Sequence, residues 1–368
     1  MSHASNTNQM IQEASVCVSV PARAPHGYDI RIAHGLRHSA GELIADVVRP
    51  CRVLLLTDDT VEALYAADVT ASLTAAGFGV VRHVIPHGEA SKSGENLLSL
   101  LEKMATEHLT RSDILVALGG GVVGDLGGFA AAVYQRGIRF VQIPTTLLAM
   151  VDASVGGKTA IDLTAGKNLV GAFHQPSLVI CDVECLGTLP PETFADGMAE
   201  VIKYAFIRDR ALFDKLQGDA TADMVETIRL CVEDKRVLVE EDETDKGARQ
   251  LLNLGHTVGH AVEACSRFEI SHGSAVAIGM VIITRAAERM GICSPEAPEA
   301  LISLLTRYGL PVACPFTTEQ LYAVALSDKK RAGGSITLAV PYGIADTRLV
   351  TVPVDALESY IRAGLSDD

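Results

Sequence analysis

The sequence predicts two parts, an α/β part built on a parallel sheet followed by a part made mostly of helices. Short β-rich runs alternate with helical patterns up to about residue 185, and helical patterns dominate after Pro190-Pro191. A chain of 368 residues is also long enough for about two domains. We expect a flexible leader at 1–22, an α/β domain at 23–185 and a mainly α-helical domain at 186–368.

The α/β domain is expected to alternate strands with crossover helices, which is typical of a parallel sheet. The predicted strands are 53–56, 80–85, 114–118, 140–143 and 178–181, and the predicted helices are 60–76, 93–107 and 123–134. Ligands of such sheets bind beyond the carboxyl ends of the strands. We therefore expect a functional site at that edge, in a cleft facing the second domain.

The second domain is expected to contain helices at 220–239, 251–266, 275–290 and 296–308. A hairpin-like pair of strands at 335–340 and 347–352 follows, and a last helix ends the chain.

Composition excludes several classes of function. The formal net charge of -14 argues against a nucleic-acid partner, because phosphate backbones are bound by clustered Lys and Arg. The apolar stretch 114–134 contains Asp125 and several glycines, so strand, turn and buried helix is favoured over a membrane span. The first 22 residues lack Lys, Arg and a continuous apolar core, and the eight cysteines show no short paired spacing. We expect a cytoplasmic protein with no membrane partner.

A glycine-rich turn, Gly119-Gly120-Gly121, follows the predicted strand 114–118. Such a turn requires positive φ or a close backbone approach, and the next helix opens at 122–125 with free amides that suit a pyrophosphate. The order differs from G-x-G-x-x-G, so a plain strand–helix turn is the alternative. Asp58 could accept a hydrogen bond from a ribose or cap the helix from Thr60. Thr145 and Thr146 could contact a nucleotide or simply form a turn. The indicated fold is a Rossmann-like nucleotide-binding domain.

Two lysines are expected on glycine-supported loops after this region, Lys158 in Gly156-Gly157-Lys158-Thr159 and Lys167 in Gly166-Lys167-Asn168. They suit an anionic ligand, whereas solvated surface lysines are the alternative. The spacing is not that of a P-loop.

A carboxylate and three histidines indicate a catalytic metal: Glu200, His256, His260 and His272. A two-His, one-carboxylate set holds a divalent ion and leaves coordination positions open. His256 and His260 share a helix face at i,i+4, but the zincin glutamate is missing between them, which disfavours peptide hydrolysis. We expect Glu200 to begin a helix capped by Asp196, with Lys203 one turn on, and His272 to begin the next helix.

Several cations would make a local anion trap in this acidic chain: Lys158, Lys203, Lys235, Arg249 and Lys329. Arg249 and Asn253 precede His256 by seven and four residues, which would place them on the same side of one helix. A solvated charged face is the alternative for Lys235 and for Lys329-Lys330.

Long ordered segments resemble the 3-dehydroquinate synthases of the sugar phosphate cyclase superfamily. They are the run from Gly119 to Pro176, FADGMAEVIKY, RQLLNLGHTVGHAVEA, HGSAVAIGM and Asp328-Lys329-Lys330. The resemblance implies conversion of 3-deoxy-D-arabino-heptulosonate 7-phosphate (DAHP) to 3-dehydroquinate and phosphate, a step of the shikimate pathway to aromatic amino acids. It further implies NAD+ that is reduced and reoxidised in each turnover, phosphate β-elimination, aldol ring closure, one divalent ion (Zn2+ or Co2+) and a homodimer.

The resemblance also implies roles for individual residues. The metal ligands would be Glu200, His256 and His272, which moves His260 to substrate and proton handling. The substrate would be surrounded by Asp152, Lys158, Asn168, Lys203, Lys235, Arg249, Asn253, His260 and Lys329, with Lys330 not separable from Lys329. Arg136 would reach the phosphate near a dimer interface. The nucleotide would contact Asp58, Glu89, Lys92, Gly121, Val122, Val123, Gly124, Asp125, Thr145, Thr146, Lys158, Lys167 and Thr188. Ser274 and Ala153 depart from the family pattern, outside these sets.

Other activities fit the same plan. Iron-dependent alcohol and glycerol dehydrogenases share this two-part fold, but their substrates do not require the cation cluster. The cluster favours a phosphorylated acid as the substrate, and therefore a lyase. Other sugar phosphate cyclases act on sedoheptulose 7-phosphate, which has no carboxylate to pair with Arg249. An aminodehydroquinate synthase acting on amino-DAHP stays open.

Overall fold

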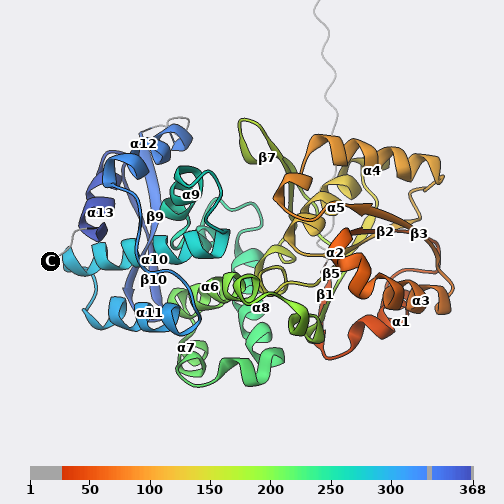
Figure 1. Ribbon diagram of the computed structural model, residues 1–368, viewed down its shortest axis with the longest axis horizontal. Coiled ribbons are helices and arrows are strands. Elements are labelled where there is room, and N and C mark those ends of the chain that lie inside the picture. Colours follow the sequence, from red (N-terminus) through yellow and green to blue (C-terminus); the bar gives the residue numbers. More distant parts are fainter. Residues whose placement is uncertain (1–26, 330–333, 366–368) are drawn as a thin grey trace, which may run out of the picture.

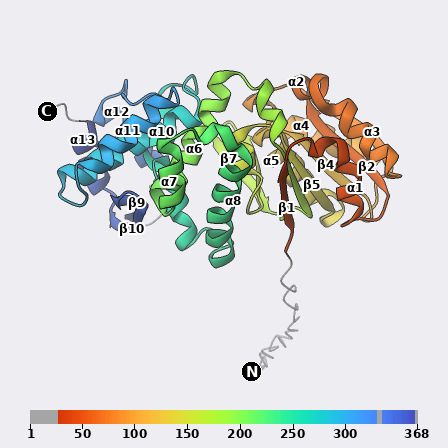
Figure 2. The same ribbon diagram turned by 90° about the horizontal axis from the view of Figure 1, so that it is seen from below.

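The computed structural model describes residues 27–329 and 334–365, without the side chains of residues 327–329. The predicted leader at 1–22 and Lys330 lie outside the described residues. Figures 1 and 2 show a sheet with its helices at one end of an elongated molecule and a helical part at the other, with α6 and α8 between them.

Six parallel strands form the main sheet in the order β1-β8-β5-β4-β2-β3. Their bounds are β1 Asp29–Ala33, β2 Arg52–Asp58, β3 Gly79–Ile85, β4 Ile114–Gly119, β5 Arg139–Pro144 and β8 Leu178–Asp182. All five predicted strands are confirmed, as β2, β3, β4, β5 and β8. The edge strand β1 was not predicted, because its half-exposed residues do not form an apolar run.

The two faces of the sheet carry separate apolar clusters, as the alternation of side chains along a strand requires. In β2, Leu54 and Leu56 pack with helices α4 (Gly94–Thr106) and α5 (Gly121–Val133). Val53 and Leu55 belong to the larger cluster on the opposite face, with α1 (Ala40–Ala45) and α3 (Ala67–Ala75). The predicted helix 60–76 comprises α2 (Asp59–Val61), a π-helical stretch (Glu62–Ala66) and α3.

The strand order changes direction between β2 and β4. The chain passes from β2 to β3 on one side and then returns to β4 and β5 on the other. Ligands of open parallel sheets bind at such a switch point, beyond the carboxyl ends of the strands. Asp58 ends β2 and Gly119 ends β4, so the predicted nucleotide turn lies where this rule places a ligand.

The segments around Lys158 and Lys167 are strands, so their prediction as loops was wrong. β6 (Lys158–Leu163) and β7 (Gly166–Phe173) form an antiparallel hairpin whose outer residues are largely exposed. Because this hairpin has only one packed side, its sequence lacks a continuous apolar run. Figure 1 shows β7 rising between the sheet part and helix α9.

The second part is mainly helical, as predicted. Its elements are α6 Pro191–Ile207, α7 Arg210–Gln217, α8 Met224–Glu241, α9 His256–Cys265, α10 His272–Arg289, α11 Glu296–Arg307, α12 Thr318–Lys329, β9 Ser335–Gly343, β10 Asp346–Pro353 and α13 Ala356–Leu365. The predicted hairpin is confirmed, since β9 and β10 are antiparallel. Among the residues that the structure describes, no helix is long and apolar enough to cross a membrane.

One predicted helix, 251–266, is broken in the middle. A 3-10 turn covers Ala248–Asn253, and α9 begins only at His256. Gly255 between them has φ +79°, and a Cβ there would lie 2.5 Å from Met280 Cγ. The chain turns at this glycine because it passes directly against α10, and the helical pattern of the sequence does not show that contact.

Candidate functional site

Glu200, His256 and His272 converge on one point, as predicted. Glu200 lies in α6, while His256 and His272 are the first residues of α9 and α10. Glu200 Oε1 lies 3.4 Å from His256 Nε2 and 3.7 Å from His272 Nε2. One donor atom from each residue falls within 4.8 Å of the other two, which is compact enough for a single cation.

The chemistry of the three side chains fits a divalent cation. Glu200 is fully buried, and its Oε1 has no hydrogen-bond partner among the described residues. Burial, helped by the charge of Lys203, holds the pKa of His256 well below its usual value, so its ring is neutral. Its Nδ1 lies 3.2 Å from the Leu254 carbonyl, which leaves Nε2 as the lone-pair nitrogen that faces Glu200.

His272 also suits a divalent cation, although its pKa is shifted in the opposite direction to that of His256. Burial lowers its pKa, but Glu200 and Glu263 outweigh burial and raise it to about 10. The two carboxylates therefore stabilise the protonated, positively charged form of this ring. A divalent cation bound between Glu200 and His272 would replace that proton, because metal binding releases protons from its ligands.

Glu200 does not begin its helix, so that expectation was wrong. Pro190-Pro191 set the start of α6 at Pro191, since proline is favoured in the first helical turn. Asp196 is consequently not a cap of α6. Its Oδ1 accepts hydrogen bonds from the Ser271 hydroxyl (2.6 Å) and from the Ser274 amide (3.1 Å), both at the beginning of α10. The Ser274 hydroxyl, which is the departure from the family pattern, adds a longer hydrogen bond of 3.4 Å to the same oxygen. Asp196 thus helps to fix the His272 helix beside the Glu200 helix.

A chain of buried charges continues from Glu200. Lys203 pairs with Glu200 and lies 3.1 Å from Asp152 Oδ2, and Lys235 pairs with Asp152 Oδ1 and donates to its carbonyl at 2.6 Å. Burial alone would raise the pKa of Asp152, yet the two lysines lower it well below its usual value. Burial lowers the pKa of Lys235, against the attraction of Asp152. The structure thus joins three predicted substrate residues directly to the metal set.

Arg249 is deeply buried beside this cluster. Its guanidinium donates to the carbonyls of Glu243 (2.6 Å) and Gly156 (3.1 Å), and its Nε has no partner among the described residues. The expectation that Arg249 and Asn253 share a helical side with His256 was wrong, because the chain turns at Gly255 before α9 begins. Asn253 ends the 3-10 turn and is half-buried.

The nucleotide turn is formed by close packing rather than by positive φ. Gly120 has φ -74°, and neither Gly119 nor Gly121 has positive φ. A Cβ on Gly119 would lie 2.6 Å from Val123 Cγ2, so close approach explains this glycine. Residues Gly121 to Asp125 form the first turn of α5, with their amides at a helix N-terminus.

The side chains predicted to bind the nucleotide are engaged with one another. Lys92 pairs with Asp125 and with the Asn168 amide oxygen. Asp58 Oδ1 accepts from the Thr60 and Val61 amides, which confirms the N-cap alternative and leaves the ribose contact a prediction.

Thr145 and Thr146 directly follow β5, and Thr188 is the last residue of a 3-10 helix, Val183–Thr188. Thr146 Oγ1 accepts from the Ala149 amide, Thr145 is buried, and the Thr188 hydroxyl contacts the hydroxyl of Tyr65. Their contacts with a nucleotide remain predictions.

The two hairpin lysines reach across to the helical part. Lys158 pairs with Asp245, and Lys167 Nζ lies 3.6 Å from Glu89 Oε1 and 3.3 Å from Glu263 Oε1. Sequence reasoning missed Glu263. A signal was available, because Glu263 follows His256 by seven residues and therefore lies on the same face of α9.

The remaining predicted residues are less closely joined to the cluster. The exposed His260 has its ring centre 5.6 Å from that of His256 and 6.1 Å from that of His272. The side chain of Lys329 lies outside the described part. Arg136 is exposed and follows α5, at the edge of the sheet opposite to the nucleotide turn.

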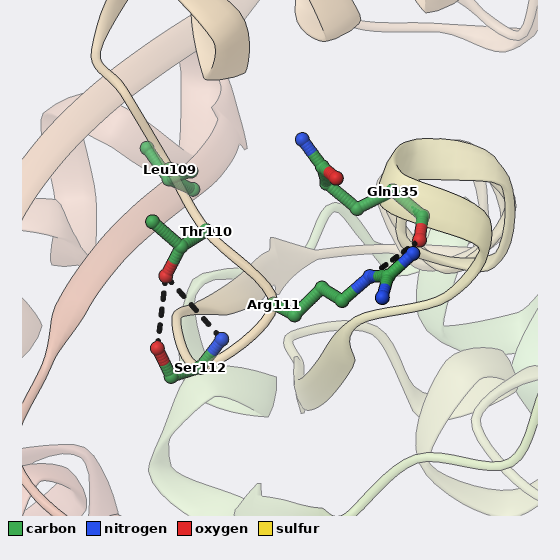
Figure 3. Close-up of a pocket in the computed structure, with 5 residues that line it drawn as sticks. All are labelled: Leu109, Thr110, Arg111, Ser112 and Gln135. Atoms are coloured by element: carbon green, nitrogen blue, oxygen red, sulfur yellow. Dashed lines mark hydrogen bonds between the residues drawn. The ribbon is translucent and has the colours of Figure 1, made fainter.

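A surface hollow lies beside Arg136. It is lined by Leu109, Thr110, Arg111, Ser112 and Gln135. Figure 3 shows that Arg111 is held there by the Gln135 carbonyl. All of these residues lie where β4 begins and α5 ends, so the hollow is separate from the site.

Comparison with known proteins agrees with this geometry. Residues 82–196 match the model of the 3-dehydroquinate synthase N-terminal domain, and residues 197–331 match that of the C-terminal domain. The chain is 42% identical over 344 residues to a 3-dehydroquinate synthase of Enterococcus faecalis, covering 92% of this chain and 96% of the relative.

Solved structures show the same fold. A 2-epi-5-epi-valiolone synthase from Streptomyces hygroscopicus with NAD+ and Zn2+ bound is 29% identical, with a TM-score of 0.85 over 94% of this chain and 98% of the other. An NADH-dependent butanol dehydrogenase from Thermotoga maritima is 14% identical, with a TM-score of 0.64 over 94% and 99% of the two chains. The dehydrogenase shares the fold alone. From the two family matches and the identity to the curated relative, the chain belongs to the 3-dehydroquinate synthase family.

Proposed function

We propose that the chain performs the 3-dehydroquinate synthase reaction of the shikimate pathway as a phosphate-eliminating lyase that uses NAD+ and one divalent metal ion. The observation that carries this proposal is the pairing of Lys203 with both Glu200 and Asp152. Because of it, the metal set and the buried cations form one charged cluster. A neutral alcohol would have no use for those cations, whereas a phosphorylated sugar acid such as DAHP needs them.

Each part of the cluster has a role in this proposal. A divalent cation (Zn2+ or Co2+) held by Glu200, His256 and His272 would supply the charge that lowers the pKa of a substrate hydroxyl. Lys203 and Arg249 would hold the anionic groups and fix one substrate conformation, which is the main contribution open to the protein. Lys235 Nζ is suited to passing a proton, since burial lowers its pKa.

The nucleotide would bind at the first turn of α5, with its pyrophosphate on the amides of 121–125. Asp58, Glu89, Lys92, Thr145, Thr146, Lys167 and Thr188 would line that region. Asp152, Lys158, Asn168, Asn253, His260 and Lys329 would complete the surroundings of the substrate. We also propose a domain boundary near residue 185, because β8 ends the sheet at Asp182 and only helices follow directly.

The test of this function is a turnover assay with purified protein, DAHP, NAD+ and Zn2+, in which phosphate and NADH are followed together. We expect phosphate equal to the DAHP consumed, with no accumulating NADH. Sedoheptulose 7-phosphate, which lacks the carboxylate, should give little phosphate. NADH accumulating without phosphate would move the chain to the dehydrogenases, and phosphate from amino-DAHP alone would make it an aminodehydroquinate synthase.

We further propose a homodimer in which Arg136 serves the partner's site. Gln135 and Arg136 both have positive φ (51° and 66°), a strained arrangement that tends to be kept at functional sites. Nearby, His174 Nε2 donates to the Ile138 carbonyl, and Phe173 next to His174 is 47% exposed. An exposed aromatic side chain on this hairpin suits a surface that a second copy covers.

Subunit mixing tests this arrangement. Arg136→Ala and Glu200→Gln homodimers should each be inactive, and dissociating and reassociating a mixture should restore activity, since mixed dimers hold one intact site. Inactivity of the mixture, with mixed dimers verified by mass, would contradict the proposal. Sedimentation should give the mass of two chains.

A further inference from the structure

Glu263 is a buried carboxylate that has no role in the function proposed above. Only 3% of its surface is exposed, and it lies on α9, two turns after His256. Its Oε2 is 3.5 Å from His272 Nδ1, and its Oε1 is 3.3 Å from Lys167 Nζ. Each oxygen therefore faces a different cationic or protonated group.

The two histidines of the metal set are held in the same way. In both rings Nε2 faces Glu200 Oε1, and in both Nδ1 faces an acceptor. For His256 this acceptor is the Leu254 carbonyl, and for His272 it is Glu263. An acceptor on the second nitrogen fixes the tautomer and the orientation of a metal-binding ring. The carbonyl precedes its own histidine, whereas Glu263 holds His272 from another helix.

We propose that Glu263 is a positioning residue that holds His272 for the metal and links this ligand, through Lys167, to the nucleotide-binding part. The inference rests on the proposed function, because it assumes that Glu200, His256 and His272 bind the cation. Lys167 completes the link, since its Nζ also lies 3.6 Å from Glu89 and 4.7 Å from the centre of the Phe268 ring. The carboxylate thus joins α9, α10 and the β6–β7 hairpin at one point.

A direct ligand role for Glu263 is the competing interpretation. One donor atom each of His260, Glu263 and His272 also falls within 4.8 Å of the other two. In that arrangement His272 would use Nδ1 for the cation. The fully buried Glu200 would then keep Lys203 beside its Oε2, but its Oε1 would have no partner among the described residues. The geometry therefore favours Glu200 as the ligand and Glu263 as the group behind His272.

The experiment measures metal affinity directly, without substrate or NAD+. Metal-free wild type, Glu263→Ala, Glu263→Gln and Lys167→Met are titrated with Zn2+ against a chromophoric chelator, and the visible spectrum of each Co2+ form is recorded. Glu269→Gln is the matched control, because Glu269 is exposed and lies six residues further along the chain. Circular dichroism and thermal unfolding verify that each variant is folded.

We expect Glu263→Ala to weaken Zn2+ binding by about 10- to 100-fold, the usual effect of removing the partner of a ligand histidine. Glu263→Gln should lose less Zn2+ affinity, because its amide oxygen still accepts a hydrogen bond from His272 Nδ1–H. The Co2+ spectrum of this variant should match that of the wild type. Lys167→Met and the control should bind Zn2+ almost normally, while Lys167→Met should weaken NAD+ binding.

Two outcomes would overturn the inference. One is an unchanged Zn2+ affinity in a folded Glu263→Ala variant. The other is loss of Zn2+ binding in Glu263→Gln together with an altered Co2+ spectrum, which would make Glu263 a ligand. A wild-type chain that binds no Zn2+ would instead contradict the proposed function, so the two failures can be told apart.

Discussion

The metal region and the nucleotide turn position their functional groups in different ways. Around Glu200 the groups proposed to bind metal and substrate all belong to side chains, and buried opposite charges pair with one another. Lys203 pairs with Glu200 and with Asp152, and Asp152 also pairs with Lys235. At the start of α5 the groups proposed to bind the nucleotide are main-chain amides, placed by a parallel strand and by glycines packed against neighbouring groups.

This difference predicts how each region responds to substitution. Removing one charge from the metal region leaves its partner buried and unpaired, which is among the most damaging changes that a protein can suffer. Adding a methyl group to the turn changes only volume, so its effect depends on the space at that position. The following predictions test this contrast, beginning with the largest effect.

Glu200→Gln should have the largest effect, because it removes both a metal ligand and the counter-charge of Lys203. We expect loss of bound metal and a fall in turnover of more than about 100-fold, since even the partners of ligands contribute 10- to 100-fold. Metal content and phosphate release measure this. A metal-free variant with full activity would refute the assignment.

Arg249→Ala should lower kcat/KM for DAHP. The expected loss of transition-state stabilisation is about 2–5 kcal/mol if Arg249 pairs with the buried substrate carboxylate. Arg249 also holds the carbonyls of Gly156 and Glu243, so thermal unfolding must be measured beside the kinetics. Arg236→Ala is the control, because Arg236 is exposed on α8. An unchanged rate would remove Arg249 from the substrate site.

Two glycines of the turn separate packing from ligand approach. A Cβ on Gly121 would meet Ala153 Cβ at 3.5 Å, an ordinary contact, so Gly121→Ala should fold normally. It should nevertheless raise the Kd of NAD+ by about tenfold, or ~1.4 kcal/mol, because the methyl group would face the pyrophosphate. Gly119→Ala meets Val123 at 2.6 Å and should instead lower stability by about 1–3 kcal/mol. Equal NAD+ affinity in Gly121→Ala and the wild type would contradict this placement.

Asp234 tests the importance of pairing, because it is a largely buried carboxylate with poor partners. Its Oδ2 has no hydrogen-bond partner among the described residues, and Arg208 Nε lies 3.7 Å from its Oδ1. Burial, together with the charge of Asp209, raises its pKa from 3.8 to about 7. The folded chain therefore holds this proton more tightly than the unfolded chain, and stability falls as pH rises from 3.8 to about 7.

Asp234→Asn should remove that fall and raise the free energy of unfolding by about 1 kcal/mol near pH 8, with a smaller gain near pH 5. Urea unfolding at both pH values measures this. Glu233→Gln is the control, because the exposed Glu233 is already paired with Arg236. An equal gain for Asp234→Asn at both pH values would show that ionisation is not the cause.

The main sheet was predictable because strands such as β4 are continuous apolar runs that only a buried sheet explains. The edge strand β1 and the β6–β7 hairpin were missed, since exposed faces interrupt their apolar pattern. The metal set was predictable from residue type and resemblance. The placement of Glu200 in the middle of α6 was not, because Pro191 decides where that helix begins. Glu263 was missed because an acidic residue on a helix is ordinary until its neighbours are known.

The most direct test of the account is phosphate release with NAD+ limiting, far below the DAHP concentration, in the presence of Zn2+. If the redox chemistry balances within each turnover, phosphate release will continue until the DAHP is consumed, and NADH will not accumulate. If phosphate release stops when its amount equals that of the NAD+ supplied, the hydride is not returned. That result would contradict a 3-dehydroquinate synthase reaction at this site.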